Sequence, residues 1–389
     1  MIEIKSKKLC TGCSACANIC PNHTIIMETD NEGFLYPKVD KENCVKCGLC
    51  EKVCHILHTS KLFNNPIAYA GYNKDERIRM ESSSGGIFTL IAEHIIDKCG
   101  VVFGAAFDEH FNVEHIVVDN KKDLAKLRAS KYVQSKIGYT YSQAKDFLEQ
   151  NRLVLFTGTP CQVAGLKSYL GKDYDNLICQ DVICHGVPSP IVWKKYMIFR
   201  EKKASSPIKF ISFRNKTKGW MNFSLFIMHE NGSKYISTIN KDMYLVGFNK
   251  NLYLRPSCYE CYYKTEQRQA DITLADFWGI QNLMPEINDD KGISLLLIHS
   301  SKGKIVLDKV KNKLVYKQVE FKSAIKYNPA MVNSMQTNKN RDKFYEELNA
   351  VDFDKLMKKY CTEKLSVRTK KKTKFLIKKV VRRIGLLIE

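Results

Sequence analysis

The chain has 389 residues, with 62 Lys and Arg against 41 Asp and Glu, and its formal net charge is +21. It is too long for one small module, and its hydrophobic fraction of 44% is enough for a folded core. No apolar run is long enough to cross a bilayer, and Lys5, Lys7 and Lys8 lead into Cys10 without the apolar core of a signal peptide, which predicts a cytoplasmic protein with reduced cysteines.

Two runs near the N-terminus contain eight of the 15 cysteines, and both have the spacing C-x2-C-x2-C-x3-C. This spacing is typical of a ferredoxin-type module with two clusters, in which the fourth cysteine of each run binds the other run's cluster. Zinc sites usually contain paired C-x2-C knuckles, and disulfides need an oxidising compartment, so both alternatives fit less well. We therefore expect one [4Fe-4S] cluster on Cys10, Cys13, Cys16 and Cys54, and a second on Cys20, Cys44, Cys47 and Cys50.

The second run departs from the ferredoxin pattern at its end. Pro21 follows the first run, whereas His55 follows the second, where ferredoxins usually have proline. This difference affects the turn and the potential of a cluster, not the number of ligands. A polar link ending in Asn64, Asn65 and Pro66 comes next, so we expect the ferredoxin-type domain to cover residues 1–60.

Strands and helices alternate after this link. The periodicity predicts strands over 67–72, 101–107, 115–118, 153–156 and 177–183, and helices over 87–95, 121–128, 141–150, 162–170 and 190–200. Further strands are expected over 208–213, 223–229, 235–238 and 293–298. This order predicts a mixed α+β and α/β fold, an α/β domain with a β-rich extension, divided into 66–150, 151–310 and a helical, basic C-terminal extension over 311–389.

Four more cysteines lie at the ends of expected elements. Cys161 begins a helix, Cys184 ends a strand, and Cys258 and Cys261 form a C-x2-C pair. By spacing alone these four residues could bind zinc, bind a third cluster, or have no common role. The isolated Cys99, Cys179 and Cys361 are interpreted as small buried or half-buried side chains.

Five motifs resemble the coenzyme F420 hydrogenase/dehydrogenase beta-subunit family. They are SKYVQS at 130–135, FTGTPCQ at 156–162, DVICHGVPSP at 181–190, CYEC at 258–261 and DITLADFWG at 271–279. The family includes beta subunits of the hydrogenase and of formate dehydrogenases, and reductases such as the one acting on hydroxymethyl chlorophyll. Its members bind flavin, usually FAD, next to an iron–sulfur cluster.

The resemblance implies a third [4Fe-4S] cluster on Cys161, Cys184, Cys258 and Cys261. It also implies that the α/β domain is a flavin-binding catalytic domain, with the flavin lined by Ser84, Gly85, Gly86, Lys131, Thr157, Gly158 and Thr159. The residues agree, because a serine–glycine turn before a helix can receive a pyrophosphate and a lysine can add a point charge. Without the resemblance, this turn would be interpreted as an ordinary flexible one and Lys131 as a solvated charge.

No catalytic group is identified from the sequence. His185 follows a candidate cluster ligand and can titrate near neutrality, which makes it a weak candidate for acid–base chemistry; Asp271 and Asp276 are interpreted as turn residues instead. A hydrogen bond to backbone or to cluster sulfur is the favoured role for a histidine in this place.

These residues predict an iron–sulfur flavoprotein oxidoreductase that is linked to ferredoxin or another redox protein. Flavin converts single electrons into a two-electron step, so FAD beside clusters suits the oxidation or reduction of a small molecule. The alternative is a non-catalytic electron-transfer subunit of a larger complex. Nucleic-acid binding is not expected, because the chain contains no recognised nucleic-acid motif.

The C-terminal segment carries much of the positive charge. Residues 361–389 contain ten Lys and Arg against two Glu, with apolar residues at roughly helical spacing between them. This pattern predicts a basic amphipathic helix in peripheral contact with an anionic membrane, at the inner membrane surface. The alternatives are a helix docked on the protein itself and a solvated tail.

Overall fold

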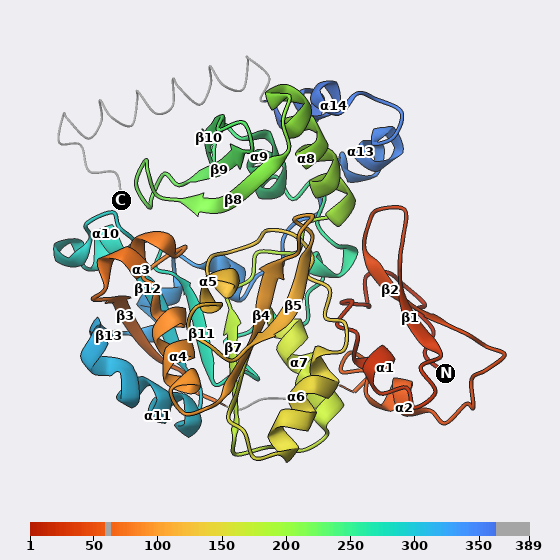
Figure 1. The fold of residues 1–389 in the computed structure, drawn as a ribbon, viewed down its shortest axis with the longest axis horizontal. Helices are drawn as coiled ribbons and strands as arrows, with labels where there is room; N and C mark the ends of the chain where they lie inside the picture. Colours follow the sequence, from red (N-terminus) through yellow and green to blue (C-terminus); the bar gives the residue numbers. More distant parts are fainter. Residues whose placement is uncertain (59–63, 363–389) are drawn as a thin grey trace.

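The computed structural model describes residues 1–58 and 64–362. In Figure 1 the cysteine-rich N-terminal part lies beside the main body, and a smaller sheet with α8 and α14 lies above it. Among the described residues, no helix is both long and apolar enough to span a membrane. The expected basic C-terminal helix lies outside the described residues from 363 onward.

The N-terminal part is a hairpin with two short helices. Strands β1 (Ile25–Thr29) and β2 (Leu35–Val39) pair antiparallel, while α1 (Ala15–Asn18) and α2 (Leu49–Lys52) follow the two cysteine loops. Ser14 and Gly48 precede these helices in the left-handed conformation, with φ values of 65° and 77°. The module contacts the rest of the chain in more than one place: α1 packs against α6 (Thr140–Glu149) and α7 (Pro160–Leu170), and Glu32, between β1 and β2, pairs with Arg341.

The body is built on an eight-stranded mixed sheet. Its order is β13 (Leu314–Val319), β3 (Ile67–Asn73), β12 (Ser294–Ile298), β11 (Ile272–Asp276), β7 (Leu177–Val182), β6 (Val154–Thr157), β4 (Val101–Phe107) and β5 (Val113–Val118). Strands β11, β7, β6 and β4 are parallel, so their carboxyl ends meet at one edge of the sheet. Ligand sites of α/β sheets usually lie at this edge.

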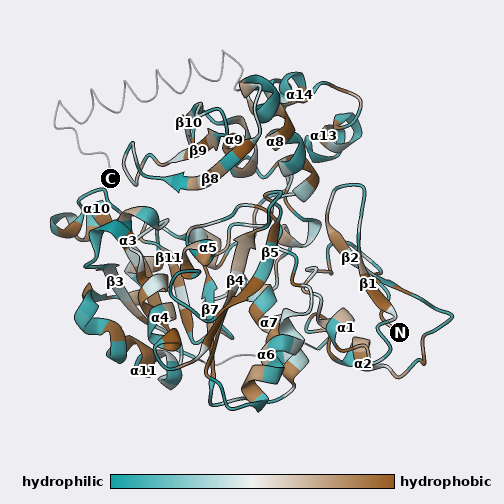
Figure 2. Ribbon diagram, in the orientation of Figure 1, coloured by the Kyte–Doolittle hydropathy of each residue, from teal (hydrophilic) through white to brown (hydrophobic). Residues whose placement is uncertain are grey.

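Helices cover both faces of this sheet, which explains its continuous apolar strands. On one face, α4 (Ile87–Ile96) and α11 (Ser301–Val310) pack on the strands; on the other, α6 and α7 enclose Phe103 and Phe156. Figure 2 shows brown hydrophobic positions among teal ones along the helices, as expected for helices with one buried face. The shorter α3 (Glu76–Glu81) and α5 (Leu124–Leu127) also flank the sheet, and α5 is shorter than the helix expected over 121–128.

A second, antiparallel sheet contains β8 (Ile208–Asn215), β9 (Ser224–His229) and β10 (Lys234–Thr238). It shares an aromatic core with four helices: α8 (Pro190–Ala204), α9 (Met243–Asn249), α13 (Arg341–Glu347) and α14 (Phe353–Cys361). Short helices α10 (Ile280–Leu283) and α12 (Phe321–Ile325) pack near β3 and β12. This sheet is the expected β-rich extension, and it places Arg214, in β8, above the carboxyl edge of the body.

Candidate functional site

All fifteen cysteines lie in the described residues and are free thiols. Cys20, Cys44, Cys47 and Cys50 line one small cavity, as the crossed ligand pattern requires. Burial raises the pKa of the Cys16 thiol, and the neighbouring Cys13, Cys10 and Cys54 raise it further. Cys20 thus lies with the cysteines of the second run, and the assignment of both sets to clusters stays a prediction.

The third set comes together from three separate segments. Cys161 lies in the first turn of α7, Cys184 lies just beyond β7, and Cys258 and Cys261 lie at and after a short 3-10 helix, Pro256–Cys258. All four line one cavity of about 310 Å³. Burial raises the pKa of Cys161, Cys184 and Cys258, for Cys258 to about 12, so a bare thiolate is unfavourable there. A cationic group is needed to hold four thiolates in this place.

The arrangement of these thiols bears on the kind of metal centre. In the described part of the chain, no group of three His, Cys, Asp or Glu side chains is close enough to hold a metal ion. The four thiols line one cavity, and the metal centre that they hold stays a prediction.

A larger cavity of about 730 Å³ opens at the carboxyl edge of the parallel strands. It is lined by six of the seven predicted flavin residues, namely Ser84, Gly86, Lys131, Thr157, Gly158 and Thr159. Gly85 instead packs into the body, where a Cβ atom would lie 2.5 Å from the carbonyl oxygen of Gly71. Cys161 and Cys184 line both this cavity and the four-thiol cavity, so the two cavities adjoin.

The start of α4 is suited to an anion. Gly86 is its N-cap, with a φ of 78°, and among the described residues no side chain makes a capping hydrogen bond there. The free N–H groups and the helix dipole therefore face the cavity at this point. Arg128, which lines the cavity, donates from Nε to Thr89 Oγ1 in the first turn at 3.2 Å, and its Nη1 is paired with Glu81. At α7, by contrast, Thr159 and Gln162 form a capping box.

Lys131 lies in the wall of the cavity. Its Nζ atom donates to the carbonyl oxygens of Arg128 and Ala129 at 3.1 and 3.2 Å. Burial lowers the pKa of Lys131 to about 7, so its charge is easily gained or lost near neutral pH. Lys131 is therefore a partly charged donor in this wall and not the solvated surface residue that its sequence alone would indicate.

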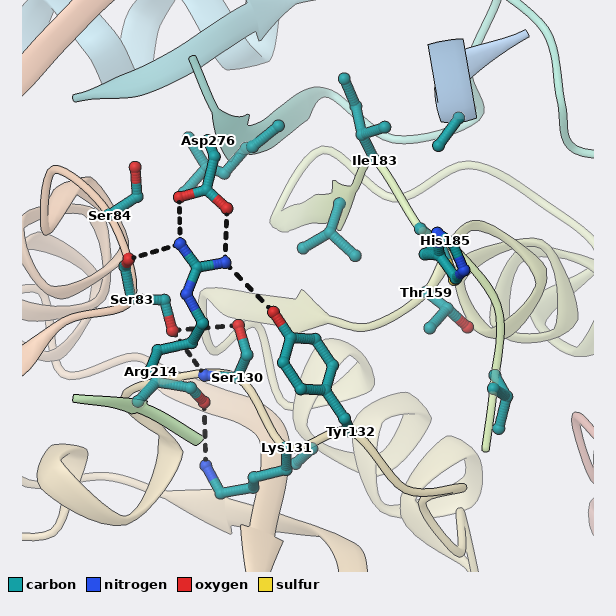
Figure 3. A pocket seen from close by; sticks show the side chains of 18 of the residues that line it. Ser83, Ser84, Ser130, Lys131, Tyr132, Thr159, Ile183, His185, Arg214 and Asp276 are labelled. Carbon is teal, nitrogen blue, oxygen red and sulfur yellow. Dashed lines mark hydrogen bonds and ion pairs between the residues drawn. The ribbon is translucent and has the colours of Figure 1, made fainter. Parts of the chain in front are cut away.

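The sequence did not indicate an ion pair that lies among the residues lining the cavity (Figure 3). Arg214 makes a bidentate pair with Asp276, at 2.7 and 2.8 Å. The guanidinium also donates to the hydroxyl of Tyr132 at 3.1 Å and to the carbonyl oxygen of Ser83 at 3.2 Å. It thereby joins the second sheet, the end of β11, the turn at residues 82–86 (the serine turn) and the segment that carries Lys131. Asp276 lies in a motif that the sequence singled out, but nothing local identified Arg214.

Two histidines in the cavity wall have structural hydrogen bonds. His185 is 2.7 Å from Asn251 Oδ1 through Nε2, and burial lowers its pKa, which fits a positioning role better than acid–base chemistry. His115 bonds through Nδ1 to Ser135 Oγ at 2.6 Å and through Nε2 to the carbonyl oxygen of Thr157 at 3.0 Å. Burial lowers the pKa of His115 to about 4, so it is neutral and fixes the turn after β6.

Comparisons with known proteins agree with these features. Residues 151–324 match the family of C-terminal domains of the coenzyme F420 hydrogenase/dehydrogenase beta chain, and residues 68–139 match the corresponding N-terminal family. Residues 9–56 match a 4Fe-4S dicluster domain. Together these matches cover the cysteine-rich module and most of the body.

Two individual proteins are also similar. The coenzyme F420-dependent sulfite reductase of Methanocaldococcus jannaschii is 28% identical over 171 residues, which are 42% of this chain and 26% of that protein. The chain thus matches about a quarter of the length of this relative. A chain of the F420-reducing [NiFe] hydrogenase complex from Methanosarcina barkeri aligns with a TM-score of 0.47 and 16% identity, over 75% of this chain and 94% of the other.

Proposed function

Because the chain belongs to the coenzyme F420 hydrogenase/dehydrogenase beta-subunit family and carries a 4Fe-4S dicluster domain, we propose that it is an iron–sulfur flavoprotein oxidoreductase. It exchanges single electrons with ferredoxin or another redox protein, and reduces or oxidises a small molecule at FAD. The observation that carries this proposal is the shared wall of the two cavities, since Cys161 and Cys184 line both.

The proposed order of the centres follows from burial. The second cluster, on Cys20, Cys44, Cys47 and Cys50, is the entry point, because Cys47 is exposed. The first cluster, on Cys10, Cys13, Cys16 and Cys54, lies next: Thr11, between two of its ligands, lines both the four-thiol cavity and the large one. The third cluster, on Cys161, Cys184, Cys258 and Cys261, then adjoins the flavin.

The chain's own residues would hold the flavin in the larger cavity. We propose that the uncapped start of α4 binds the pyrophosphate, with Ser84 and Gly86 in the turn, while Gly85 holds the turn against β3 and β12. Lys131, which follows Ser130 beside the turn, and the segment Thr157–Thr159 also line this cavity. When bound, the flavin supplies the coupling between one-electron and two-electron transfer.

Substrate and domain limits belong to the same proposal. The deazaflavin coenzyme F420, named for the family and for the sulfite reductase, is one candidate substrate, and another small acceptor is the second. We propose the domain limits 1–60, 66–150, 151–310 and 311–389, the last with a basic tail at the inner membrane surface.

One experiment separates an enzyme from an electron-transfer subunit. The full chain, purified without oxygen, is supplied with reduced ferredoxin and with either F420 or a dye that accepts electrons from reduced flavin. Turnover without any further protein besides ferredoxin is expected if the large cavity holds both FAD and the substrate. Protein that contains its clusters and flavin but turns over neither acceptor would instead be the subunit of a larger complex.

A further inference from the structure

His55 follows the second cysteine run, where ferredoxins usually have proline. In the structure it lies between the first and third sets of ligand cysteines. Its side chain is buried, with the residue 4% exposed. Nε2 lies 3.3 Å from Cys13 Sγ, in the first ligand set, and Nδ1 bonds to the hydroxyl of Tyr263. Tyr263 follows Cys261 by two residues and lines the four-thiol cavity. The imidazole therefore joins the first ligand set to the third.

The direction of these hydrogen bonds follows from the chemistry of a ligand cysteine. A cysteine that binds iron is a thiolate, so Cys13 can accept a hydrogen bond but cannot donate one. The ring nitrogen that faces it, Nε2, donates to Cys13 when it carries the hydrogen, and its other polar neighbour is Thr11 Oγ1, at 3.5 Å. In a neutral imidazole Nδ1 is then the acceptor, and the Tyr263 hydroxyl has to donate to it. Tyr263 thus selects the tautomer in which His55 donates to the first cluster.

A buried cation reaches the same ligand set from the third segment. Arg255, three residues before Cys258, is 1% exposed. Its Nε donates to the carbonyl oxygen of Cys10 at 2.9 Å, and its Nη2 lies 3.7 Å from Cys10 Sγ. Gly12 makes room for it, because a Cβ at that position would lie 2.8 Å from Nη1. A full positive charge is therefore held beside the first cluster.

The second set has neutral hydrogen-bond donors to its sulfurs, and its nearby cations are compensated or solvated. The Met1 ammonium is paired with Glu51 at 2.7 Å, and Lys46 is exposed, whereas Arg255 is buried. The backbone N–H of Ile2 donates to Cys50 Sγ at 3.2 Å, and Thr24 Oγ1 lies 3.2 Å from Cys20 Sγ. Hydrogen bonds to sulfur, local charge and solvent exposure set the reduction potentials of iron–sulfur clusters. A reduced cluster carries one more negative charge than an oxidised one, so a nearby cation and an additional N–H donor stabilise it.

We propose that His55 and Arg255 hold the first cluster at a higher reduction potential than the second, with Tyr263 fixing His55 as the donor. This inference rests on the proposed function, since it requires both clusters to be present. Electrons that enter at the exposed second cluster then move energetically downhill to the first, next to the third ligand set. His55 is a positioning and tuning residue, not a catalytic one.

The test is an anaerobic potentiometric titration of the full chain with dithionite, followed by electron paramagnetic resonance, with iron counted in every sample. His55→Leu removes the donor and should lower the midpoint potential of one N-terminal cluster. His55→Gln keeps an N–H group in place of Nε2 and should restore much of the shift. Tyr263→Phe should lower the same potential without touching Cys13, because Nδ1 can then carry the hydrogen. The matched control, Thr24→Val, should shift the other, lower-potential cluster.

The outcomes separate this inference from the proposal beneath it. Unchanged midpoint potentials in both His55→Leu and Tyr263→Phe, with full iron content, would overturn the inference alone. The inference would also be overturned if Thr24→Val and His55→Leu change the midpoint potential of the same cluster. Wild-type protein that reconstitutes with no clusters at the N-terminal sets would overturn the proposed function, whatever His55 does.

Discussion

Replacing Arg214 with leucine should destabilise the protein by about 3 kcal/mol, because the change leaves Asp276 buried without its cation. Removing one member of a buried ion pair typically costs about 3–5 kcal/mol. The side chains of Arg214 and Asp276 are 3% and 14% exposed, so the pair is well buried. The lower end of the range applies because Asp276 still accepts a hydrogen bond from Trp220 Nε1 at 2.7 Å.

A second substitution tests this reasoning. Asp276→Asn added to Arg214→Leu removes the unpaired charge and keeps an oxygen that accepts from Trp220, so most of the lost stability should return. The matched control is Arg77→Leu, which breaks a pair with Glu81 on the surface at 4.0 Å and should cost less than about 1 kcal/mol.

The assay is anaerobic thermal unfolding at one scan rate, together with titration of FAD into flavin-free protein. Arg214→Leu should lower the unfolding midpoint by on the order of 5 °C. It should also weaken FAD binding about tenfold, because the serine turn loses the contact at the Ser83 carbonyl. If Arg214→Leu is as stable as Arg77→Leu, the pair does not hold the cavity together and the reasoning is refuted.

Three further results are expected. Gly86→Ala should destabilise the protein by about 1–2 kcal/mol through left-handed strain, and it should weaken FAD binding. The control Gly138→Ala, at a φ of 58° with open space around it, should cause the strain alone. Equal FAD affinities of the two variants would contradict the role of the α4 turn. Burial lowers the pKa of His115 to about 4, so the unfolded state binds the proton more readily than the folded state does. The contribution of His115 to the free energy of unfolding should be complete above about pH 6.5. It should fall by up to about 3 kcal/mol as the pH drops to 4. His115→Gln should flatten this slope in acid unfolding, and an unchanged slope would mean that His115 titrates normally. Deleting residues 368–389 should abolish binding to anionic vesicles at low salt with clusters and flavin retained, and equal binding by the shortened chain would remove the membrane contact.

Regular patterns made much of the architecture predictable. Continuous apolar runs at 101–107 and 177–183 indicated buried strands, and β4 and β7 are found there because helices cover both faces of the sheet. The grouping of the N-terminal thiols followed from spacing, since short loops limit which sulfurs can meet. The β1–β2 hairpin was missed, because its strands are short and β2 contains Pro37.

Contacts between distant residues were not predictable in this way. Arg214 and Asp276 are 62 positions apart, and neither lies in a pattern that depends on the other. The sequence predicts that Gly85 contacts the flavin together with its neighbours. In the structure, the lack of a side chain at Gly85 allows the backbone of Gly71 to approach closely. The contacts of His55 could not be predicted from its replacement of the usual proline, because its partner Tyr263 is 208 residues away.

The central claim is that three clusters and one flavin share this chain, and cofactor analysis of the full chain after anaerobic reconstitution tests it most directly. Twelve ligand cysteines in three sets predict about twelve irons, a similar amount of sulfide, and about one FAD per chain. The matched variant Cys184→Ser should lose about four irons and keep the N-terminal eight. About eight irons in the wild-type protein, or one zinc in place of the other four, would contradict the third cluster, and protein that never takes up flavin would contradict the proposed two-electron chemistry.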